Sequence, residues 1–224
     1  MTKFQRARSA EQREIRRRAI LDTTAAMLDE MPVSEISLNE LSRRVGLAKS
    51  NVLRYFESRE AILLELLDRA TKRWVSEFSG LLAAEGGPNA SARERGDRFA
   101  AVLARSLVRH PVLCDLFSAQ AAVLEHNVSV EVVARHKRAM RANLVALAEP
   151  VRRHLPELGA HVPEVCFMAA MAIGAVWPHS RPSDSTLAAY RADPELAVMR
   201  VDFAGVLEEM VAALVAGVLA RAAP

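Results

Sequence analysis

Proline and glycine gather at a few points of this sequence, and the segments between those points are long. The 224 residues include ten prolines and nine glycines, with breaks at Pro32, at 86–89 and at a few later prolines. Between the breaks, apolar residues recur every three or four positions, as on one face of a helix. No segment alternates with the period of two that strands show, or has a turn about every ten residues. The chain is therefore predicted to be all-α.

The expected helices follow from caps and breakers. Ser9 and Gln12 have the spacing of a capping box for a first helix that ends at Met31-Pro32. The polar segment 178–194 is expected to be a loop, and the run 86–89 to be a break between helices. Beyond that break, helices are predicted near 91–109, 111–124, 129–154, 161–177 and 195–221.

Residues 37–56 have the pattern of a helix-turn-helix. Ser37 and Glu40 form a second capping box, and the short helix that follows ends at Gly46, where a tight turn needs a positive φ. A further short helix is expected from about Ala48 to Tyr55. Two short helices joined through glycine are typical of this DNA-binding motif. Its small core is expected to contain Leu41, Val45, Leu47 and Val52.

The exposed face of the second helix carries the residue types that read bases. Lys49 and Arg54 suit guanine, Asn51 suits adenine, and Ala48 or the Ser50 methylene suits a thymine methyl group. Lys49 is one of only four lysines in a chain with twenty-six arginines. This face is predicted to enter the major groove of DNA.

Positive charge is concentrated at the N-terminal end. Residues 1–60 contain twelve basic and nine acidic side chains, whereas the other 164 contain eighteen of each. The first twenty residues form a basic arm suited to a polyanion. Its basic members are Lys3, Arg6, Arg8, Arg13, Arg16, Arg17 and Arg18.

The stretch 37–63, SLNELSRRVGLAKSNVLRYFESREAIL, resembles the DNA-binding domain of the TetR/AcrR family, and residues 20–28, ILDTTAAML, resemble that family's first helix. The resemblance covers roughly residues 10–65. It implies a homodimer that binds a near-palindromic operator, usually as a repressor released by a small ligand. Carried over by position, it implies groove contacts from Ala48, Lys49, Ser50, Asn51 and Arg54, and phosphate contacts from Ser37, Tyr55 and Arg59.

Three positions depart from the family's usual residues. Leu53 stands where the family most often has Tyr, which removes one usual phosphate contact. Tyr55 stands where His or Tyr is common, and Arg59 replaces the more usual Lys. These departures concern single contacts and leave the motif intact.

Two domains are expected: residues 1–60 as the helix-turn-helix domain with its basic arm, and residues 61–224 as a helical domain for ligand binding and dimerisation. A pocket in the second domain would suit a largely apolar effector. Its polar contacts are left open among His110, Gln120, Asn143 and His179. The candidate pocket residues are Trp74, Phe78, Phe99, Leu103, Leu107, Phe117, Met140, Phe167, Met171 and Trp177.

The helix expected at 196–220 is apolar around much of its circumference, so it needs burial on more than one side. In the family it would pair with the helix near 163–177 and with the symmetry mates of both, forming a four-helix dimer interface. The alternative is that it lies in the core of a monomer. Its longest apolar run, 210–220, is expected to be too short to span a membrane, and no membrane partner is predicted.

Enzyme motifs are not found in the sequence. The six histidines form no metal-binding pair, and no phosphate-binding loop or nucleophile elbow occurs. Cys114 and Cys166 are expected to be small buried side chains, and neither a cofactor nor a metal is predicted. Without an apolar leader, a cytoplasmic location is expected. The alternative class, an all-α ligand carrier or enzyme with an incidental basic lead helix, stays open.

Overall fold

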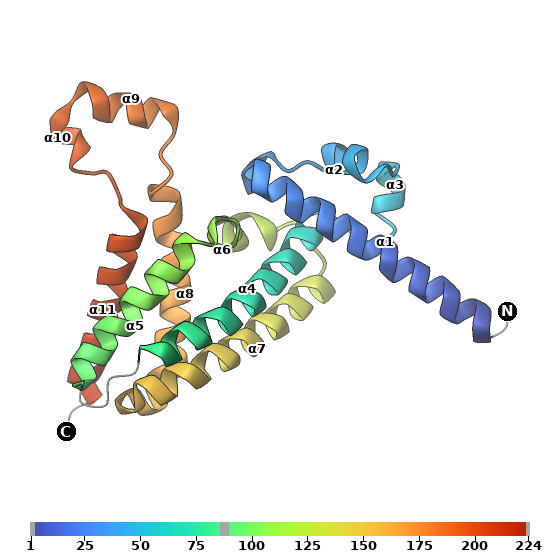
Figure 1. Ribbon diagram of the computed structural model, residues 1–224. Helices are drawn as coiled ribbons and strands as arrows, with labels where there is room; N and C mark the ends of the chain where they lie inside the picture. The colour runs from blue at the N-terminus through green and yellow to red at the C-terminus, as the bar shows by residue number, and fades with distance from the viewer. Residues whose placement is uncertain (1–2, 86–89, 223–224) are drawn as a thin grey trace.

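The computed structural model describes residues 3–85 and 90–222, with side chains for 11–85 and 90–221 (Figure 1). Within these ranges every regular element is helical, which confirms the all-α prediction. The expected break at 86–89 lies outside the described residues, and the side chains of Lys3, Arg6 and Arg8 in the basic arm are likewise not described. The first four α-helices and one 3₁₀ turn are α1 (Lys3–Glu30), η1 (Val33–Glu35), α2 (Leu38–Val45), α3 (Lys49–Val52) and α4 (Arg59–Ala84).

The remaining elements form the larger part of the molecule. They are α5 (Ala92–Val108), α6 (Pro111–Ala119), a π-helical turn η2 (Gln120–Leu124), α7 (Val130–His154), a 3₁₀ segment η3 (Pro156–His161), α8 (Val162–His179), α9 (Asp184–Ala192), α10 (Pro194–Ala197) and α11 (Phe203–Ala222).

Helices α1, α2 and α3 pack together at the N-terminal end of α4. Ile20 and Met27 of α1, Leu41 of α2 and Val52 of α3 are all fully buried there. Thr24 is buried among them and satisfies its hydroxyl by donating to the carbonyl of Ile20 at 2.8 Å. These apolar positions form a small three-helix core, on which α2 and α3 depend because helices of eight and four residues are too short to be stable alone.

The larger part is a bundle in which α4 packs along α7, α5 along α11, and α8 against α6, α7 and α11 (Figure 1). Trp74 stacks on Phe78 at 5.3 Å between ring centroids, and Phe78 meets the edge of Phe99 at 6.0 Å, which joins α4 to α5. Trp177 of α8 contacts Phe203 of α11 in the same edge-on way at 5.0 Å. The buried apolar residues of both parts form one continuous cluster.

Both cysteines occupy the bundle interior. Cys114 and Cys166 are fully buried, as predicted, and neither forms a disulfide. Burial raises the pKa of each thiol to about 12, so both thiols stay protonated and unreactive at neutral pH.

Several predicted boundaries are wrong. The first helix begins at Lys3, ahead of the Ser9 cap, and the third ends at Val52 instead of Tyr55, with turns continuing beyond it. The segment 178–194 is not only a loop, because Ser183 accepts a hydrogen bond from the Thr186 amide and opens helix α9.

The last long helix also differs from the prediction. It begins at Phe203, because the Asp202 carboxylate accepts from the Gly205 amide at 2.8 Å and caps a new helix start. The residues expected at its beginning form the short α10 instead. Helices α9 and α10 contain no buried residue and project away from the bundle (Figure 1).

Two described helical stretches, Pro156–His179 and Phe203–Arg221, are long and apolar enough to cross a membrane by length and composition. The apolar run 210–220 was predicted to be too short to span a membrane, but the helix that contains it, Phe203–Ala222, is longer than that run. Core helices of proteins outside membranes pass the same test. Only 33% and 22% of an apolar 18-residue window in each stretch is buried, so both leave apolar surface uncovered in one chain.

The turn glycine gives a stability prediction. Gly46 has φ +70° and no neighbouring atom within 4 Å of an added Cβ, so Gly46→Ala adds only backbone strain and lowers the free energy of unfolding by about 1 kcal/mol. The control Gly80→Ala, at an equally open position inside α4, raises it by about 0.5–1 kcal/mol. Urea unfolding followed by circular dichroism measures both, and an unchanged midpoint for Gly46→Ala would contradict the assigned turn.

Candidate functional site

The turn between α2 and α3 is held by hydrogen bonds that the sequence pattern predicts. The Ser37 hydroxyl accepts from the Glu40 amide at 3.1 Å, which caps α2. The predicted capping box is only half formed, because the Glu40 carboxylate bonds to Arg43 and Arg44 instead of the Ser37 amide. Gly46 ends α2 in the left-handed conformation, and the next amide, that of Leu47, donates to the Ser42 carbonyl at 3.0 Å. These bonds fix the direction in which α3 leaves α2.

Helix α3 is a single turn with one buried and one exposed side. Val52 is fully buried and anchors it, while Tyr55 is half-buried. The structure brings the predicted groove residues together on one exposed surface, hereafter the α3 face. The α3 face consists of Ala48, Lys49, Ser50, Asn51 and Arg54.

A polar cleft of about 720 Å³ lies beside the α3 face, between α1 and the turn after α3. Arg13 and Arg16 line it from α1, and Arg54 and Tyr55 line it from the other side. A guanidinium nitrogen of Arg13 donates to the Arg54 carbonyl at 3.4 Å, which ties the two walls together. Among the side chains that the structure describes, none of these arginines, nor Lys49, has a carboxylate partner.

Other cations of this region are already neutralised. Arg44 pairs with Glu30 at 2.7 Å and with Glu40 at 2.9 Å, and Arg43 pairs with Glu40 at 2.6 Å. Hydrogen bonds from Arg43 and then Arg44 lower the pKa of the Glu40 carboxyl to about 2. Arg17 pairs with Glu65 and lies over the Phe56 ring. Among the described side chains of this region, the cations without a carboxylate partner thus include Lys49 and Arg54 of the α3 face and Arg13 and Arg16 of its cleft.

Two of the three predicted phosphate-binding side chains, unlike those of the α3 face, already have hydrogen-bond partners within the protein. Arg59 uses its guanidinium inside the protein, since it donates to the Ile36 carbonyl at 2.7 Å and to Glu60 at 3.1 Å. Ser37 is exposed at the α2 N-terminus but its hydroxyl already accepts the capping bond. Tyr55 borders the cleft.

Besides the Arg17–Glu65 pair, two hydrogen bonds join the helix-turn-helix part to bundle elements other than α4. The Val33 amide donates to the Asp115 carboxylate of α6 at 2.7 Å, and the Ser129 amide before α7 donates to Glu57 at 2.6 Å. The sequence reasoning missed both, because each pairs a carboxylate with an amide more than seventy positions away.

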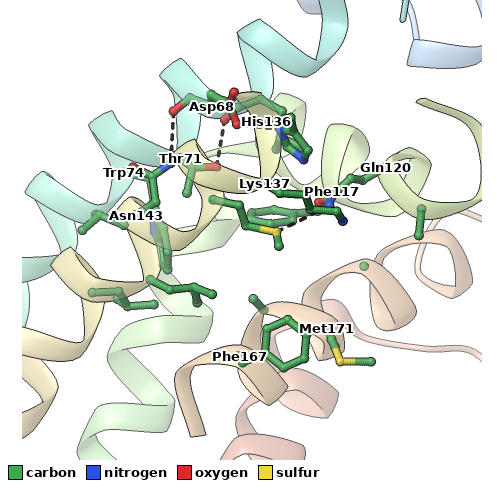
Figure 2. Close-up of a pocket in the computed structure, with 18 of the residues that line it drawn as sticks. Asp68, Thr71, Trp74, Phe117, Gln120, His136, Lys137, Asn143, Phe167 and Met171 are labelled. Carbon is green, nitrogen blue, oxygen red and sulfur yellow. Dashed lines mark hydrogen bonds and ion pairs between the residues drawn. The ribbon is translucent and has the colours of Figure 1, made fainter. Parts of the chain in front are cut away.

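A cavity of about 420 Å³ lies in the bundle between α4, α6, η2, α7 and α8 (Figure 2). Most of its wall is apolar. It is lined by Leu67, Asp68, Thr71, Trp74, Val75, Phe117, Ser118, Gln120, Ala121, Ala122, His136, Lys137, Met140, Asn143, Leu144, Leu147, Phe167, Ala170, Met171 and Gly174.

Half of the predicted pocket residues line this cavity: Trp74, Phe117, Met140, Phe167 and Met171. The others do not and lie elsewhere in the core. Phe78 lies one turn after Trp74 on α4, but its ring packs against Phe99 of α5 and not into the cavity. The Trp177 ring packs against Phe203 of α11. Of the four polar candidates, Gln120 and Asn143 line the cavity, but His110 pairs with Glu77 and His179 is exposed. The five residues excluded from the cavity are Phe78, Phe99, Leu103, Leu107 and Trp177.

His136 is the most buried polar side chain of the cavity wall, at 2% exposed, and the sequence reasoning missed it. Its Nδ1 lies 2.8 Å from the Asp68 carboxylate, and its Nε2 has no hydrogen-bond partner. The signal that could have found it is spacing, since His136, Met140, Asn143 and Leu147 recur along one face of α7.

Comparisons with known proteins match both parts of the chain. Residues 20–66 match the model of bacterial regulatory proteins of the tetR family, and residues 68–222 match the model of the tetracyclin repressor-like C-terminal domain. The chain belongs to the TetR family. The resemblance found in residues 10–65 is therefore confirmed and extends through the bundle.

Individual relatives match only part of the chain. The TetR family member EthR, an HTH-type transcriptional regulator from Mycobacterium tuberculosis, is 37% identical over 65 residues, which are 29% of this chain and 29% of that protein. EthR from Mycolicibacterium smegmatis is 33% identical over 81 residues, or 36% of this chain and 37% of its own. The matched part thus spans about a third of these curated relatives.

One solved structure shares the fold over nearly the full length. A TetR transcriptional regulator from Rhodococcus sp. RHA1 aligns with 96% of this chain and 100% of its own, at a TM-score of 0.53 and 15% identity. At that identity the likeness concerns the fold alone. It agrees with an N-terminal helix-turn-helix followed by a helical C-terminal domain.

The Glu40 pairing predicts a pH dependence in this TetR family protein. Since its pKa is lowered from about 4.5 to about 2, the stabilisation from Glu40 is complete above pH 4.5 and is lost as the pH falls through 2. An NMR titration of the Glu40 carboxyl carbon is expected to have its midpoint near pH 2. In the control Arg43→Gln/Arg44→Gln the midpoint returns to about 4.5, and a wild-type midpoint above 4 would contradict the paired geometry.

Proposed function

We propose that the chain is a ligand-responsive, DNA-binding transcriptional regulator. In this proposal it is a repressor that binds a near-palindromic operator as a homodimer and is released by a small, largely apolar effector. The observation that carries the proposal is the α3 face, where base-reading side chains lie exposed on a turn that Val52 and Gly46 hold in place. Membership of the TetR family supports the same function.

The groove contacts are assigned to the α3 face. Lys49 and Arg54 donate to guanine O6 and N7, Asn51 pairs with adenine, and Ala48 and Ser50 contact thymine methyl groups. Tyr55 and Ser37 contact phosphates from the flanks. Arg59 first has to release the Ile36 carbonyl or share it, so its phosphate contact is the weakest part of the assignment.

The cleft and the basic arm supply sequence-independent affinity. Arg13 and Arg16 are exposed beside the α3 face without a carboxylate partner among the described side chains, so they can replace counterions on phosphates. The arm that begins at Lys3 continues the same charge. We assign residues 1–60 to this DNA-binding domain and 61–224 to effector binding and dimerisation.

The effector site is assigned to the cavity, whose size and apolar wall suit a small molecule. The cavity residues Trp74, Phe117, Met140, Phe167 and Met171 would contact the effector. Phe117 lies two residues from Asp115, whose carboxylate holds the Val33 amide beside the helix-turn-helix. A ligand that shifts α6 would therefore change the position of α1 and α2.

The dimer interface is assigned to α8 and α11, which pack side by side and expose a shared apolar surface. The side chain of Met168 on α8 is 51% exposed, and those of Val206 and Met210 on α11 are 37% and 46% exposed. Pairing with a second copy would cover this apolar surface. In this proposal the dimer is cytoplasmic, as suits a regulator of transcription, and needs no membrane to cover its apolar helices. No catalytic role is part of the proposal.

Selection of bound sequences from a random DNA pool tests the function directly. It is expected to return a near-palindrome with two half-sites about one helical turn apart. Lys49→Ala and Asn51→Ala are each expected to weaken binding to the selected site by about 1–3 kcal/mol, because each removes a base contact. The control Lys72→Ala, an exposed lysine on α4, leaves the affinity unchanged. Recovery of no preferred sequence would contradict the proposal.

Charge substitution tests the dimer. Met210→Glu is expected to raise the dimer dissociation constant by about a hundredfold or more, because each interface would bury an unpaired carboxylate. The control Val145→Glu changes an equally apolar side chain, 64% exposed on α7 outside this surface, and leaves the dimer intact. Sedimentation equilibrium measures both. A monomeric wild type at micromolar concentration, or one that binds lipid vesicles, would overturn the assigned interface.

A further inference from the structure

One end of the cavity is polar, and the apolar walls lie across from it. Figure 2 shows Asp68 and His136 on one side and Phe167 and Met171 of α8 on the opposite side. We propose that the effector is an apolar molecule whose head group donates a hydrogen bond to Nε2 of His136, such as a hydroxyl or an amino group, and that carboxylates are disfavoured. This proposal rests on the proposed function of the cavity as the effector site.

The Asp68–His136 pair determines what Nε2 can accept. A carboxylate oxygen of Asp68 lies 2.8 Å from Nδ1 and can only accept, so Nδ1 carries the proton that joins them. The neutral ring is part of the proposal, and in that form Nε2 is a bare lone pair. It is buried and has no partner in the protein, and a buried acceptor left unpaired is unfavourable. A donor on the ligand satisfies it.

The donor groups of the cavity wall are already directed at protein acceptors. The Thr71 and Ser118 hydroxyls donate to the carbonyls of Leu67 and Asp115, both at 2.8 Å. The Trp74 indole donates to Ser106 at 2.9 Å. These occupied donors leave Nε2 of His136 as the group that still requires a partner.

The amides of the wall are directed in the same way. The Asn143 amide reaches the Asp68 carbonyl at 3.4 Å, and the Gln120 amide donates to Glu125 at 2.8 Å. The Gln120 nitrogen also lies 3.6 Å from the Met140 sulfur, so both of its N–H groups have partners, whereas one N–H of Asn143 is left for a ligand acceptor.

Carboxylates near Nε2 disfavour an anionic head group. The Glu125 carboxylate lies 3.8 Å from Nε2 and is fixed there by Lys137 at 2.7 Å. Asp68 lies on the other side of the ring. A carboxylate placed at Nε2 would meet two like charges against the single cation of Lys137, and no donor would be available from the neutral ring. A hydroxyl or an ammonium group meets no such repulsion.

The rest of the cavity accepts an apolar body. Phe117, Phe167 and Leu147 provide rings and branched carbon, and Met140 and Met171 provide flexible thioethers that adapt to different shapes. A volume of about 420 Å³ lies within the range of small-molecule sites. In this proposal the apolar wall selects the size of the ligand body, and the opposite wall around His136 selects its head group.

Three probes with one alkyl chain and different heads test the proposal: 1-decanol, decylamine and sodium decanoate. Trp74 lines the cavity and Trp177 does not, so Trp74 fluorescence in a Trp177→Phe background reports binding. We expect 1-decanol or decylamine to bind at least about tenfold more tightly than decanoate, the value of one hydrogen bond. The alcohol and the amine arms tell a neutral donor from a cationic one.

His136→Asn is the diagnostic variant, because its amide keeps a donor at the Nδ1 position for Asp68 but has no atom at the Nε2 position. It is expected to weaken the preferred probe by about tenfold and to leave decanoate unchanged. His136→Gln, which restores a polar atom near Nε2, is expected to recover part of that loss. The control His161→Asn changes an exposed histidine outside the cavity and has no effect. Circular dichroism checks that each variant is folded.

Three results would overturn the proposal: decanoate binding as tightly as the other probes, an unchanged preference in folded His136→Asn, or no fluorescence response to any probe up to 1 mM (about the weakest useful affinity). The assay contains no DNA. A failure here therefore leaves the operator selection untouched, and a chain that selects no DNA sequence can still be tested for its cavity ligand.

Discussion

Helix α4 is the constraint on which both sites depend. Its 26 residues extend over roughly 39 Å without a break. Near its N-terminus, fully buried Ile62 and Leu63 belong to the same core as the helix-turn-helix. Further along, Asp68 and Trp74 form a wall of the cavity. Under the proposed function, a displacement at the cavity wall would pass along α4 to the core beneath the α3 face.

Two hydrogen bonds complete this connection at points away from α4. The Asp115 carboxylate of α6 holds the Val33 amide between α1 and α2, and Glu57 before α4 holds the Ser129 amide before α7. Phe117 on the same helix as Asp115 contacts the cavity. Under the proposed function, an effector acts by biasing α4 and α6 between two positions, and the bonds at Val33 and Ser129 carry that bias to the α3 face.

The features that could be predicted from the sequence are those set by residues close together in the chain. The Ser37 cap and the Gly46 turn are fixed by their own backbone conformations, so the helix-turn-helix could be recognised from residues 37–56 alone. Asp68 and His136 lie 68 positions apart, and only the packing of α4 on α7 brings them together. Phe78 and Phe117 have the same character in the sequence, but one fills the core and the other borders a cavity, because the difference depends on where neighbouring helices leave space.

If the proposed function is right, the cavity and the α3 face are coupled. The direct test is to titrate 1-decanol with Trp74 fluorescence in the absence and presence of saturating selected operator, and to measure operator affinity with and without saturating 1-decanol. Coupled sites must change each other's affinity by the same factor, and typical couplings are about 5–150-fold. We predict that operator weakens the ligand and the ligand weakens operator by equal factors in that range. The claim would be contradicted if operator left the affinity for 1-decanol unchanged and 1-decanol left the affinity for operator unchanged.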